Sequence, residues 1–314
     1  MDLGFAVPIS GSWATPQNQV ELAQRAEELG YRSLWTFQRL LYPAEPPLWA
    51  PVYAAVHDPI VTLSYLAGVT SRVRLGLAVV NTPFYSPVVL AKQLTTLDIV
   101  SGGRLVAGLG LGWSREEFAA AGVDYEQRGA RGEEFLRCLD AIWTQDVVEF
   151  AGEFYTVPRC RIDPKPVQQP RPHVVLGGSA PRALERAGRL ADGWVAGSVF
   201  SLDRTADAVR AVRAAAETAG RDPDALDYVV RGVVRVRDGG AGVRTGPGSD
   251  SERRLLSGSF DEIEDDLGRL AAAGVTETFL DLNFDEEVGH PDADADASTE
   301  RARAVLERFA PATG

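Results

Sequence analysis

The residues best suited to chemistry form a turn of two glycines and a serine, Gly177-Gly178-Ser179, directly after a short apolar run. Glycine has no Cβ, so the backbone can approach a ligand closely. A helix that opens at Ser179 would add unpaired amides and the positive end of its dipole. Together these features suit an anion, most often a phosphate. A tight strand-to-helix turn with Ser179 as an ordinary N-cap explains the same residues, so the turn alone leaves both interpretations open.

Few other residues are spaced for catalysis or for metal binding. Cys138 and Cys160 are the only cysteines, and their separation matches no zinc, haem or redox motif. They are therefore expected to be two thiols in a reducing cytoplasm. The three histidines are scattered, so no protein-bound metal is expected. The chain has no Gly-x-Ser-x-Gly motif, which counts against a serine hydrolase of the α/β type.

Composition narrows the range of partners. A net charge of −12 argues against general binding to nucleic acid or to anionic membranes. No apolar run is long enough to cross a bilayer, and the first residues read as a strand without a basic segment before it. We therefore expect a cytoplasmic protein that binds neither nucleic acid nor membranes.

Strand-like and helix-like segments alternate along almost the whole chain, and these elements must position the turn. Eight such alternations favour a single (β/α)8 barrel domain over residues 1–314, with a doubly wound sheet as the alternative. The glycine-rich segment 108–112 departs from a dinucleotide fingerprint, because Trp113 stands where its third glycine belongs. This departure counts against the doubly wound sheet. The expected strands are residues 2–10, 33–38, 74–81, 104–112, 174–177, 194–199, 228–236 and 278–284.

Insertions are expected after strands 2, 4 and 7 of this barrel. Residues 39–57 are rich in proline, which stiffens the chain, and in aromatic residues that suit a substrate wall or a subunit contact. Residues 147–157 read as a hairpin, and residues 238–253 read as a loop rich in glycine, serine and charge.

In a barrel of this kind, sites gather where the strands end at the carboxyl-terminal face. This rule brings residues 37–39, 78–81, 110–114, 177–179 and 196–198 to one mouth. Ser114 and Glu117 have the spacing of a capping box, so a second helix start is expected there. Ordinary turn chemistry explains each segment singly, but their convergence favours a functional site.

Several segments in matched order and spacing resemble the bacterial-luciferase-like flavin/deazaflavin oxidoreductases. These segments are AEELGYRSLW at 26–35, VSGGRL at 100–105, GLGLGWSREEF at 108–118, and DPKPVQ with VVLGGS between 163 and 179. The resemblance covers roughly residues 3–281 and is closest to the branch that uses the deazaflavin coenzyme F420. Homodimers are usual in that family.

The resemblance implies roles for particular residues. Gly177, Gly178 and Ser179 match the turn that holds the cofactor phosphate. Ala78 and Val79 match a bulge, often with a non-proline cis peptide, that backs the cofactor ring. Trp113 stands where some deazaflavin dehydrogenases carry glutamate, so it would wall the pocket without moving protons. The implied cofactor-binding residues are Ala78, Val79, Asn81, Gly110, Trp113, Gly177, Gly178 and Ser179.

The end of the second strand departs from the family pattern. Relatives commonly carry an acidic residue followed by histidine, whereas this chain has Gln38 and Arg39, which are the candidate catalytic residues. Arginine is always charged, so Arg39 cannot inherit a general acid or base role. It is a candidate for stabilising a reduced, anionic ring or for binding an acidic substrate. A salt bridge under the rim is the alternative.

The resemblance implies an F420-dependent oxidoreductase that transfers a hydride between its cofactor and a small organic substrate. An FMN-dependent monooxygenase is the first alternative, since it would use the same barrel and the same phosphate turn. A flavin-binding protein without turnover is the second alternative, because the histidine is missing. The sequence identifies no particular substrate.

Overall fold

The computed structural model describes residues 1–46, 48–197, 201–237 and 253–311. In this part of the chain, parallel strands close into an eight-stranded barrel, in which β1 pairs with both β2 and β13 and β3 pairs with β5. A doubly wound sheet would have two free edges, so closure excludes that alternative. Around the barrel the strands are β1 (Asp2–Ala6), β2 (Ser33–Thr36), β3 (Arg74–Leu77), β5 (Leu105–Gly110), β8 (His173–Gly177), β9 (Gly193–Ala196), β10 (Asp227–Val233) and β13 (Glu277–Asp281).

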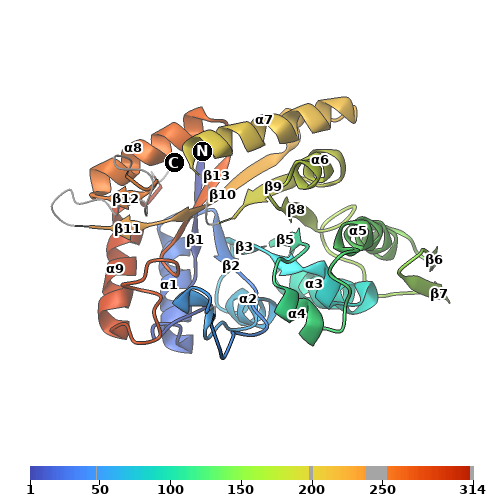
Figure 1. Cartoon of the computed structure of the whole chain (residues 1–314), viewed down its shortest axis with the longest axis horizontal. Coiled ribbons are helices and arrows are strands. Elements are labelled where there is room, and N and C mark those ends of the chain that lie inside the picture. Colours follow the sequence, from blue (N-terminus) through green and yellow to red (C-terminus); the bar gives the residue numbers. More distant parts are fainter. Residues whose placement is uncertain (47, 198–200, 238–252, 312–314) are drawn as a thin grey trace.

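Helices surround the barrel as an outer layer (Figure 1). Several begin with proline, whose fixed φ suits the first helical position. The side chains of Thr15 and Asp58 cap two of these helices by accepting a backbone N–H. The longer helices are α1 (Pro16–Glu28), α2 (Pro59–Ala67), α3 (Pro87–Val100), α5 (Arg128–Thr144), α6 (Pro181–Leu190), α7 (Leu202–Thr218), α8 (Phe260–Ala272) and α9 (Ala295–Arg308).

Smaller elements follow β2, β3, β5 and β10. The segment after β2 contains the 3₁₀ turn η1 (Pro51–Tyr53), and β4 (Val80–Asn81) continues β3 after a break. After β5 come the short helix α4 (Arg115–Ala120), then α5, and then an antiparallel hairpin, as the sequence predicted for this region. The hairpin strands are β6 (Val148–Ala151) and β7 (Thr156–Cys160), and the remaining elements are η2 (Thr82–Phe84), η3 (Pro223–Ala225), β11 (Arg235–Val236) and β12 (Ser257–Gly258).

Two expectations fall partly outside the described residues. Residues 238–252 of the loop expected at 238–253 lie outside the described residues. Residues 198 and 199 of the strand expected at 194–199 also lie outside them. No helix in the described ranges is long and apolar enough to cross a membrane. The assignment of residues 1–314 to one domain stays a prediction.

The core has two layers. The larger one lies between the barrel and the helices, and a smaller one fills the barrel itself. Inside the barrel, the Trp35 ring stacks on Phe279 with 4.9 Å between centroids. Gly76 leaves room for this stack, because a Cβ there would lie 2.4 Å from the Trp35 ring. The barrel is therefore a packed interior with no open pore, as is usual for this architecture.

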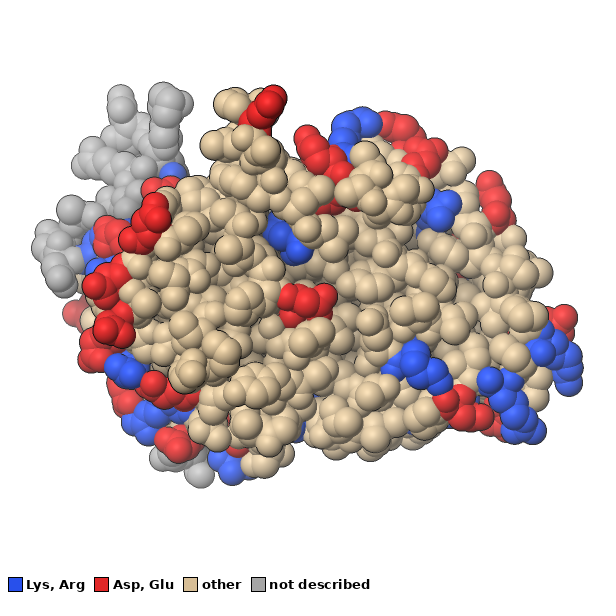
Figure 2. All heavy atoms as spheres, turned by 90° about the horizontal axis from the view of Figure 1, so that it is seen from below, with Lys and Arg blue, Asp and Glu red and all other residues tan. Residues whose placement is uncertain are grey.

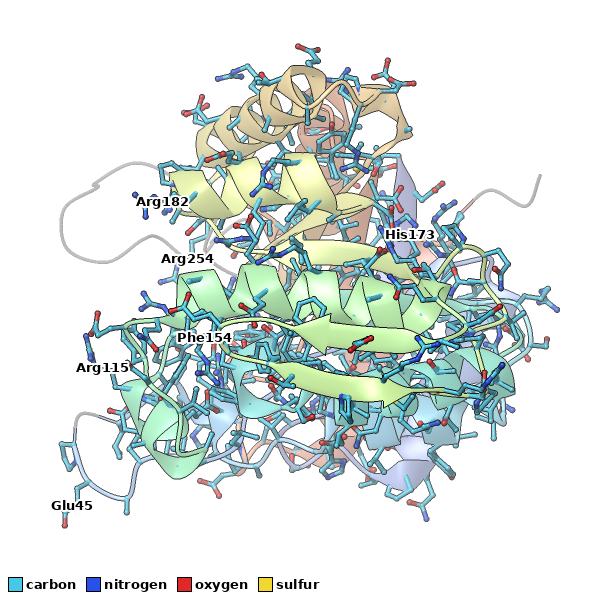
Figure 3. The ribbon with its side chains drawn as sticks, turned by 90° about the vertical axis from the view of Figure 1, so that its right-hand side faces the viewer. Glu45, Arg115, Phe154, His173, Arg182 and Arg254 are labelled. Carbon is cyan, nitrogen blue, oxygen red and sulfur yellow. The ribbon has the colours of Figure 1, made fainter. Side chains whose placement is uncertain are left out.

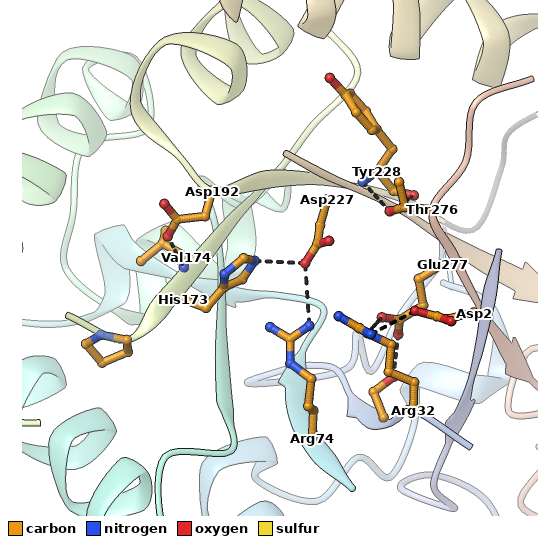
Figure 4. Close-up of polar contacts among 12 residues, drawn as sticks. Asp2, Arg32, Arg74, His173, Val174, Asp192, Asp227, Tyr228, Thr276 and Glu277 are labelled. Carbon is orange, nitrogen blue, oxygen red and sulfur yellow. Dashed lines mark hydrogen bonds and ion pairs between the residues drawn. The ribbon is translucent and has the colours of Figure 1, made fainter. Parts of the chain in front are cut away.

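Charged residues close the amino-terminal end of the barrel (Figure 4). Asp227 lies 2.9 Å from His173 Nε2 and 3.4 Å from Arg74 Nη1, and each of the three residues begins a strand. Beside them, Arg32 pairs with Asp2 at 2.8 Å and with Glu277 at 3.5 Å. At this end of a barrel such pairs serve stability, so the functional site is sought at the opposite end.

Candidate active site

A cleft of about 750 Å³ lies at the carboxyl ends of the strands. Its volume suits a ligand of cofactor size. The structure brings every predicted site residue to its wall, although whether they bind a cofactor or take part in catalysis stays a prediction. Those residues are Gln38, Arg39, Ala78, Val79, Asn81, Gly110, Trp113, Gly177, Gly178 and Ser179.

The turn after β8 differs from the sequence prediction in one respect. Helix α6 starts at Pro181 with Ala180 as its N-cap, so the expectation that the helix opens at Ser179 was wrong. Proline is favoured at the first helical position, which moves the helix start two residues along the chain. Ala180 makes no side-chain cap, Pro181 has no amide hydrogen, and the Ala183 amide donates to the Ala180 carbonyl at 2.8 Å. Of the first three residues of α6, Arg182 is therefore the one whose amide is left for an anionic ligand. The turn thus fits a phosphate without Ser179 as a cap.

Gly178 has a backbone conformation that other residues rarely adopt. Its φ is +135°, and a Cβ at this position would lie 2.7 Å from Cβ of Ala183 in α6. The Gly178 carbonyl accepts a hydrogen bond of 2.8 Å from Trp194 Nε1, which ties the turn to β9. Glycine is therefore required here by the backbone as well as by any ligand.

The break between β3 and β4 contains a cis peptide bond between Ala78 and Val79, as the family resemblance implied. The Val79 side chain lies between two glycines of the neighbouring strands. A Cβ on Gly110 would lie 2.4 Å from Val79 Cγ2, and a Cβ on Gly177 would lie 3.0 Å from Val79 Cγ1. These two glycines therefore make room for Val79, which in turn forms part of the cleft wall.

Gln38 is buried, and both ends of its amide are occupied. Its Oε1 accepts a hydrogen bond of 2.9 Å from the Asn81 amide, and its Nε2 donates one of 2.6 Å to the Tyr85 hydroxyl. Burial raises the pKa of Tyr85 to about 12, so this hydroxyl stays protonated near neutral pH. Gln38 thus fixes the segment that follows the cis peptide. The Gln38 side chain itself has no ionisable group.

Arg39 forms a salt bridge, which was the alternative to a catalytic role in the sequence prediction. Its Nη1 lies 3.1 Å from Oε2 of Glu117, and its guanidinium lies 4.5 Å from the Tyr53 ring centre and 4.7 Å from that of Trp113. These contacts hold Arg39 in the cleft wall by charge and by cation–π attraction. A catalytic role for Arg39 stays a prediction.

Glu117 has a different role from the one that its spacing suggested. The Ser114 hydroxyl accepts a hydrogen bond of 3.1 Å from the Glu117 amide, which is one half of a capping box. The Glu117 carboxylate, however, turns away from Ser114 and accepts a bond of 2.7 Å from the Leu40 amide as well as the one from Arg39. Glu117 is fully buried and ties the segment after β2 to α4. Spacing alone could not show this, because the partners lie far apart in the sequence.

Replacing Glu117 by alanine is expected to destabilise the protein by about 3 kcal/mol, because it leaves Arg39 and the Leu40 amide without their buried acceptor. Urea unfolding followed by tryptophan fluorescence measures the change. Glu117→Gln is the matched control: it keeps an acceptor for Leu40 and should lose clearly less stability. Equal stability of the alanine variant and the wild-type protein would contradict this role.

The cleft lining also contains residues that were not among the predicted site residues, and these include Tyr125, Arg128, Arg204 and Arg231. Arg231 carried a sequence signal, since it interrupts the apolar run of residues 228–234 and lies inside β10. The other three lie on loop and helix starts, where charged and aromatic residues are ordinary. Only the closure of the barrel brings them to the cleft.

Arginines line the cleft although the chain is acidic, and two of them, Arg39 and Arg231, are paired with the buried carboxylates of Glu117 and Asp281. The described lining of the cleft contains four arginines and no aspartate, glutamate or histidine, whereas the whole chain carries a net charge of −12. Figure 3 shows Arg115, Arg182 and Arg254 at the same end of the barrel, opposite His173 at the start of β8. A cleft of this charge suits an anionic ligand. Across the described residues, no cluster of histidine, cysteine, aspartate or glutamate could hold a metal ion.

A cleft at the carboxyl-terminal mouth of a (β/α)8 barrel is where enzymes of this fold have their active sites. The chain belongs to the luciferase-like monooxygenase family, whose sequence model matches residues 3–277. It is therefore an oxidoreductase of the luciferase-like type. The relatives include F420-dependent oxidoreductases and FMNH₂-dependent monooxygenases.

Two characterised relatives illustrate this division. The chain is 33% identical to an FMNH₂-dependent dimethylsulfone monooxygenase of Pseudomonas putida, over 65% of this chain and 55% of that enzyme. It is 31% identical to an F420-dependent glucose-6-phosphate dehydrogenase of Amycolatopsis mediterranei, over 68% of this chain and 64% of that enzyme. The chain thus spans little more than half of the first relative and just under two thirds of the second.

Solved structures show the same fold. The monooxygenase RslO1 from Streptomyces bottropensis superimposes with a TM-score of 0.80 at 21% identity, covering 98% of each chain. An F420-dependent secondary alcohol dehydrogenase gives a TM-score of 0.74 at 16% identity, covering 90% of this chain and 95% of that one. These likenesses show the shared fold.

Proposed function

We propose that the protein is a coenzyme F420-dependent oxidoreductase that transfers a hydride between this cofactor and a small organic substrate. The observation that carries the proposal is the arginine-lined cleft in an otherwise acidic chain. F420 and FMN both present a phosphate and a tricyclic ring. The tail of F420 continues beyond its phosphate and carries further carboxylates, so it gains more from additional arginines than FMN does.

The residues of the cleft fit such a cofactor. The Arg182 amide at the start of α6, together with Gly178 and Ser179, would hold the phosphate, and Ala78 and Val79 would back the ring. Arg128 and Arg204 also line the cleft and would attract the anionic tail. The cofactor supplies the hydride chemistry, while the protein positions the reactants and excludes water.

The described lining contains no carboxylate, imidazole or thiol that could exchange a proton near neutral pH. Any proton transfer at the substrate would therefore use a hydroxyl group, such as that of Tyr53, or solvent. The remaining wall is aromatic, with Phe37, Tyr53 and Trp113 around the Arg39 guanidinium. This wall suits a substrate with a flat, largely apolar surface.

The purified protein is expected to bind F420 at least about tenfold more tightly than FMN, and added salt should weaken F420 binding because exposed charges are screened. Fluorescence titration with each cofactor at two salt concentrations measures both effects. Tight FMN binding without F420 binding would reject the proposal in favour of an FMN-dependent monooxygenase. Binding of either cofactor without electron transfer to any substrate tested would favour a binding protein without turnover.

We also propose that the protein is a homodimer in the cytoplasm. Helices α2 and α3 pack together and leave Val61, Tyr65 and Val89 exposed. Figure 2 shows that charged side chains are sparse on the face seen from below, with one acidic group near its centre. A second copy of the chain would cover these apolar residues.

Sedimentation equilibrium of the wild-type protein is expected to give twice the chain mass. The Val61→Glu substitution should shift the measured mass toward that of the monomer. A monomeric wild-type protein would reject the dimer.

A further inference from the structure

Arg231 reaches across the interior of the barrel. It belongs to β10, and its Nη2 donates a hydrogen bond to the Ala78 carbonyl at the end of β3. In the closed order of strands, β10 and β3 lie opposite each other, with three strands between them on either side. The bond therefore spans the barrel under the cleft and ends on the carbonyl of the cis peptide.

The surroundings of Arg231 fix its position. Its guanidinium lies 4.9 Å from the ring centre of Phe284 and 5.1 Å from that of Phe37. Its Nε lies 3.5 Å from Oδ2 of the fully buried Asp281. The other oxygen of that carboxylate, Oδ1, accepts two hydrogen bonds of 2.9 Å, from the amide and from Nδ2 of Asn283. Arg231 lines the cleft, whereas Asp281 does not. The positive end of the pair therefore faces the cleft.

Stability alone does not account for this pair. Taking two charges out of water costs free energy, and replacing a buried ion pair by neutral side chains of similar size is often neutral or stabilising. The pair is also not fully satisfied, because Nε of Arg231 and Oδ2 of Asp281 form no hydrogen bond with any described residue. A costly, incompletely bonded charge at the floor of a ligand cleft indicates a role toward the ligand.

We propose that Arg231 is a positioning residue for the cofactor ring: it holds the Ala78–Val79 peptide against the ring and places a fixed positive charge beneath it. The inference rests on the proposed function only in requiring a flavin-like ring in this cleft, whether from F420 or from FMN. A positive charge under the ring stabilises negative charge on it. Arg231 therefore favours whichever form of the ring carries more negative charge.

The test compares the wild-type protein with three variants by thermal unfolding and by cofactor titration. The double substitution Arg231→Met/Asp281→Asn removes both charges, so no uncompensated charge stays buried. Arg231→Lys keeps the charge but loses the forked donor. Arg104→Met is the matched control, because Arg104 also ties backbone carbonyls, those of Ala67, Thr70, Val73 and Ser101, but lies before β5 at the other end of the barrel.

The double variant is expected to unfold within a few degrees of the wild-type protein, to bind the oxidised cofactor about tenfold more weakly and to shift its absorbance maximum. Arg231→Lys should recover part of that affinity. Arg104→Met should unfold earlier and bind normally. Unchanged affinity and absorbance in the double variant would overturn the inference, as would a loss of the same size in Arg104→Met.

The proposed function and this inference can fail separately. If the wild-type protein binds FMN and not F420, the proposed function is rejected, and the same variants titrated with FMN still decide the role of Arg231. If the wild-type protein binds F420 and the double variant binds it equally well, only the inference fails. If neither cofactor binds the wild-type protein, both are rejected.

Discussion

Replacing Gly178 by alanine is expected to weaken cofactor binding by about 10- to 100-fold. At φ +135° a Cβ would lie 2.7 Å from Cβ of Ala183, so the turn must change its backbone conformation. Strain of this kind costs about 1–3 kcal/mol, and each 1.4 kcal/mol of lost binding is a factor of ten. The change also moves the start of α6, whose Arg182 amide we propose helps to hold the phosphate. Fluorescence titration with F420 and FMN measures the loss.

Gly220→Ala is the control for this substitution. Gly220 also has a positive φ, of +72°, but a Cβ there would meet nothing within 4 Å, and the residue does not line the cleft. The control should lose about 1 kcal/mol of stability and keep its cofactor affinity. Normal cofactor affinity in Gly178→Ala would show that the turn does not hold the phosphate.

Replacing Gly108 by alanine is expected to destabilise the fold by about 3 kcal/mol or more, because overpacking at a rigid backbone contact cannot relax by moving a side chain. A Cβ at Gly108 would lie only 1.6 Å from the carbonyl oxygen of Leu77 in β3. The substitution would therefore push β5 away from β3, and with it the cis peptide that follows Leu77. Thermal unfolding should show a midpoint lower by about 5 °C or more.

A glycine in an open position provides the comparison. Gly268 lies inside α8, and a Cβ there would meet nothing within 4 Å. Gly268→Ala should stabilise the protein by about 0.5–1 kcal/mol, because alanine is the better helix former. If Gly108→Ala unfolds at the wild-type temperature, the close approach of the two strands is not a constraint on the fold.

These substitutions separate two uses of glycine that look alike in the sequence. The segment 108–112 resembles a nucleotide-binding loop by composition, yet Gly108 and Gly110 are required by neighbouring protein atoms, the Leu77 carbonyl and the Val79 side chain. Gly177 likewise makes room for Val79. Gly178 is the glycine whose φ shapes the turn that we propose binds the phosphate. A glycine pattern therefore indicates close packing first, and ligand binding only where the glycine also shapes a turn in the cleft wall.

The sequence by itself determined the barrel and the place of the site. Alternating strands and helices are local patterns, and the carboxyl ends of parallel strands must meet at one face once the barrel closes. For this reason the ten predicted residues could be placed at one mouth, and they all line the cleft. The start of α6 was misplaced because Ser179 is a good N-cap, whereas Pro181 at the first helical position decides the boundary.

The charge arrangement was decided only by the tertiary structure. Arg39 meets Glu117, 78 positions away, and Arg231 meets the Ala78 carbonyl, 153 positions away. In a sequence, a buried arginine and an exposed arginine look alike. The spacing of residues along the chain also does not show which group lies next to a buried arginine in the folded protein. A buried charge must find a partner that its own strand or helix cannot supply. That partner is determined by closure of the barrel, which brings opposite strands within reach of one side chain.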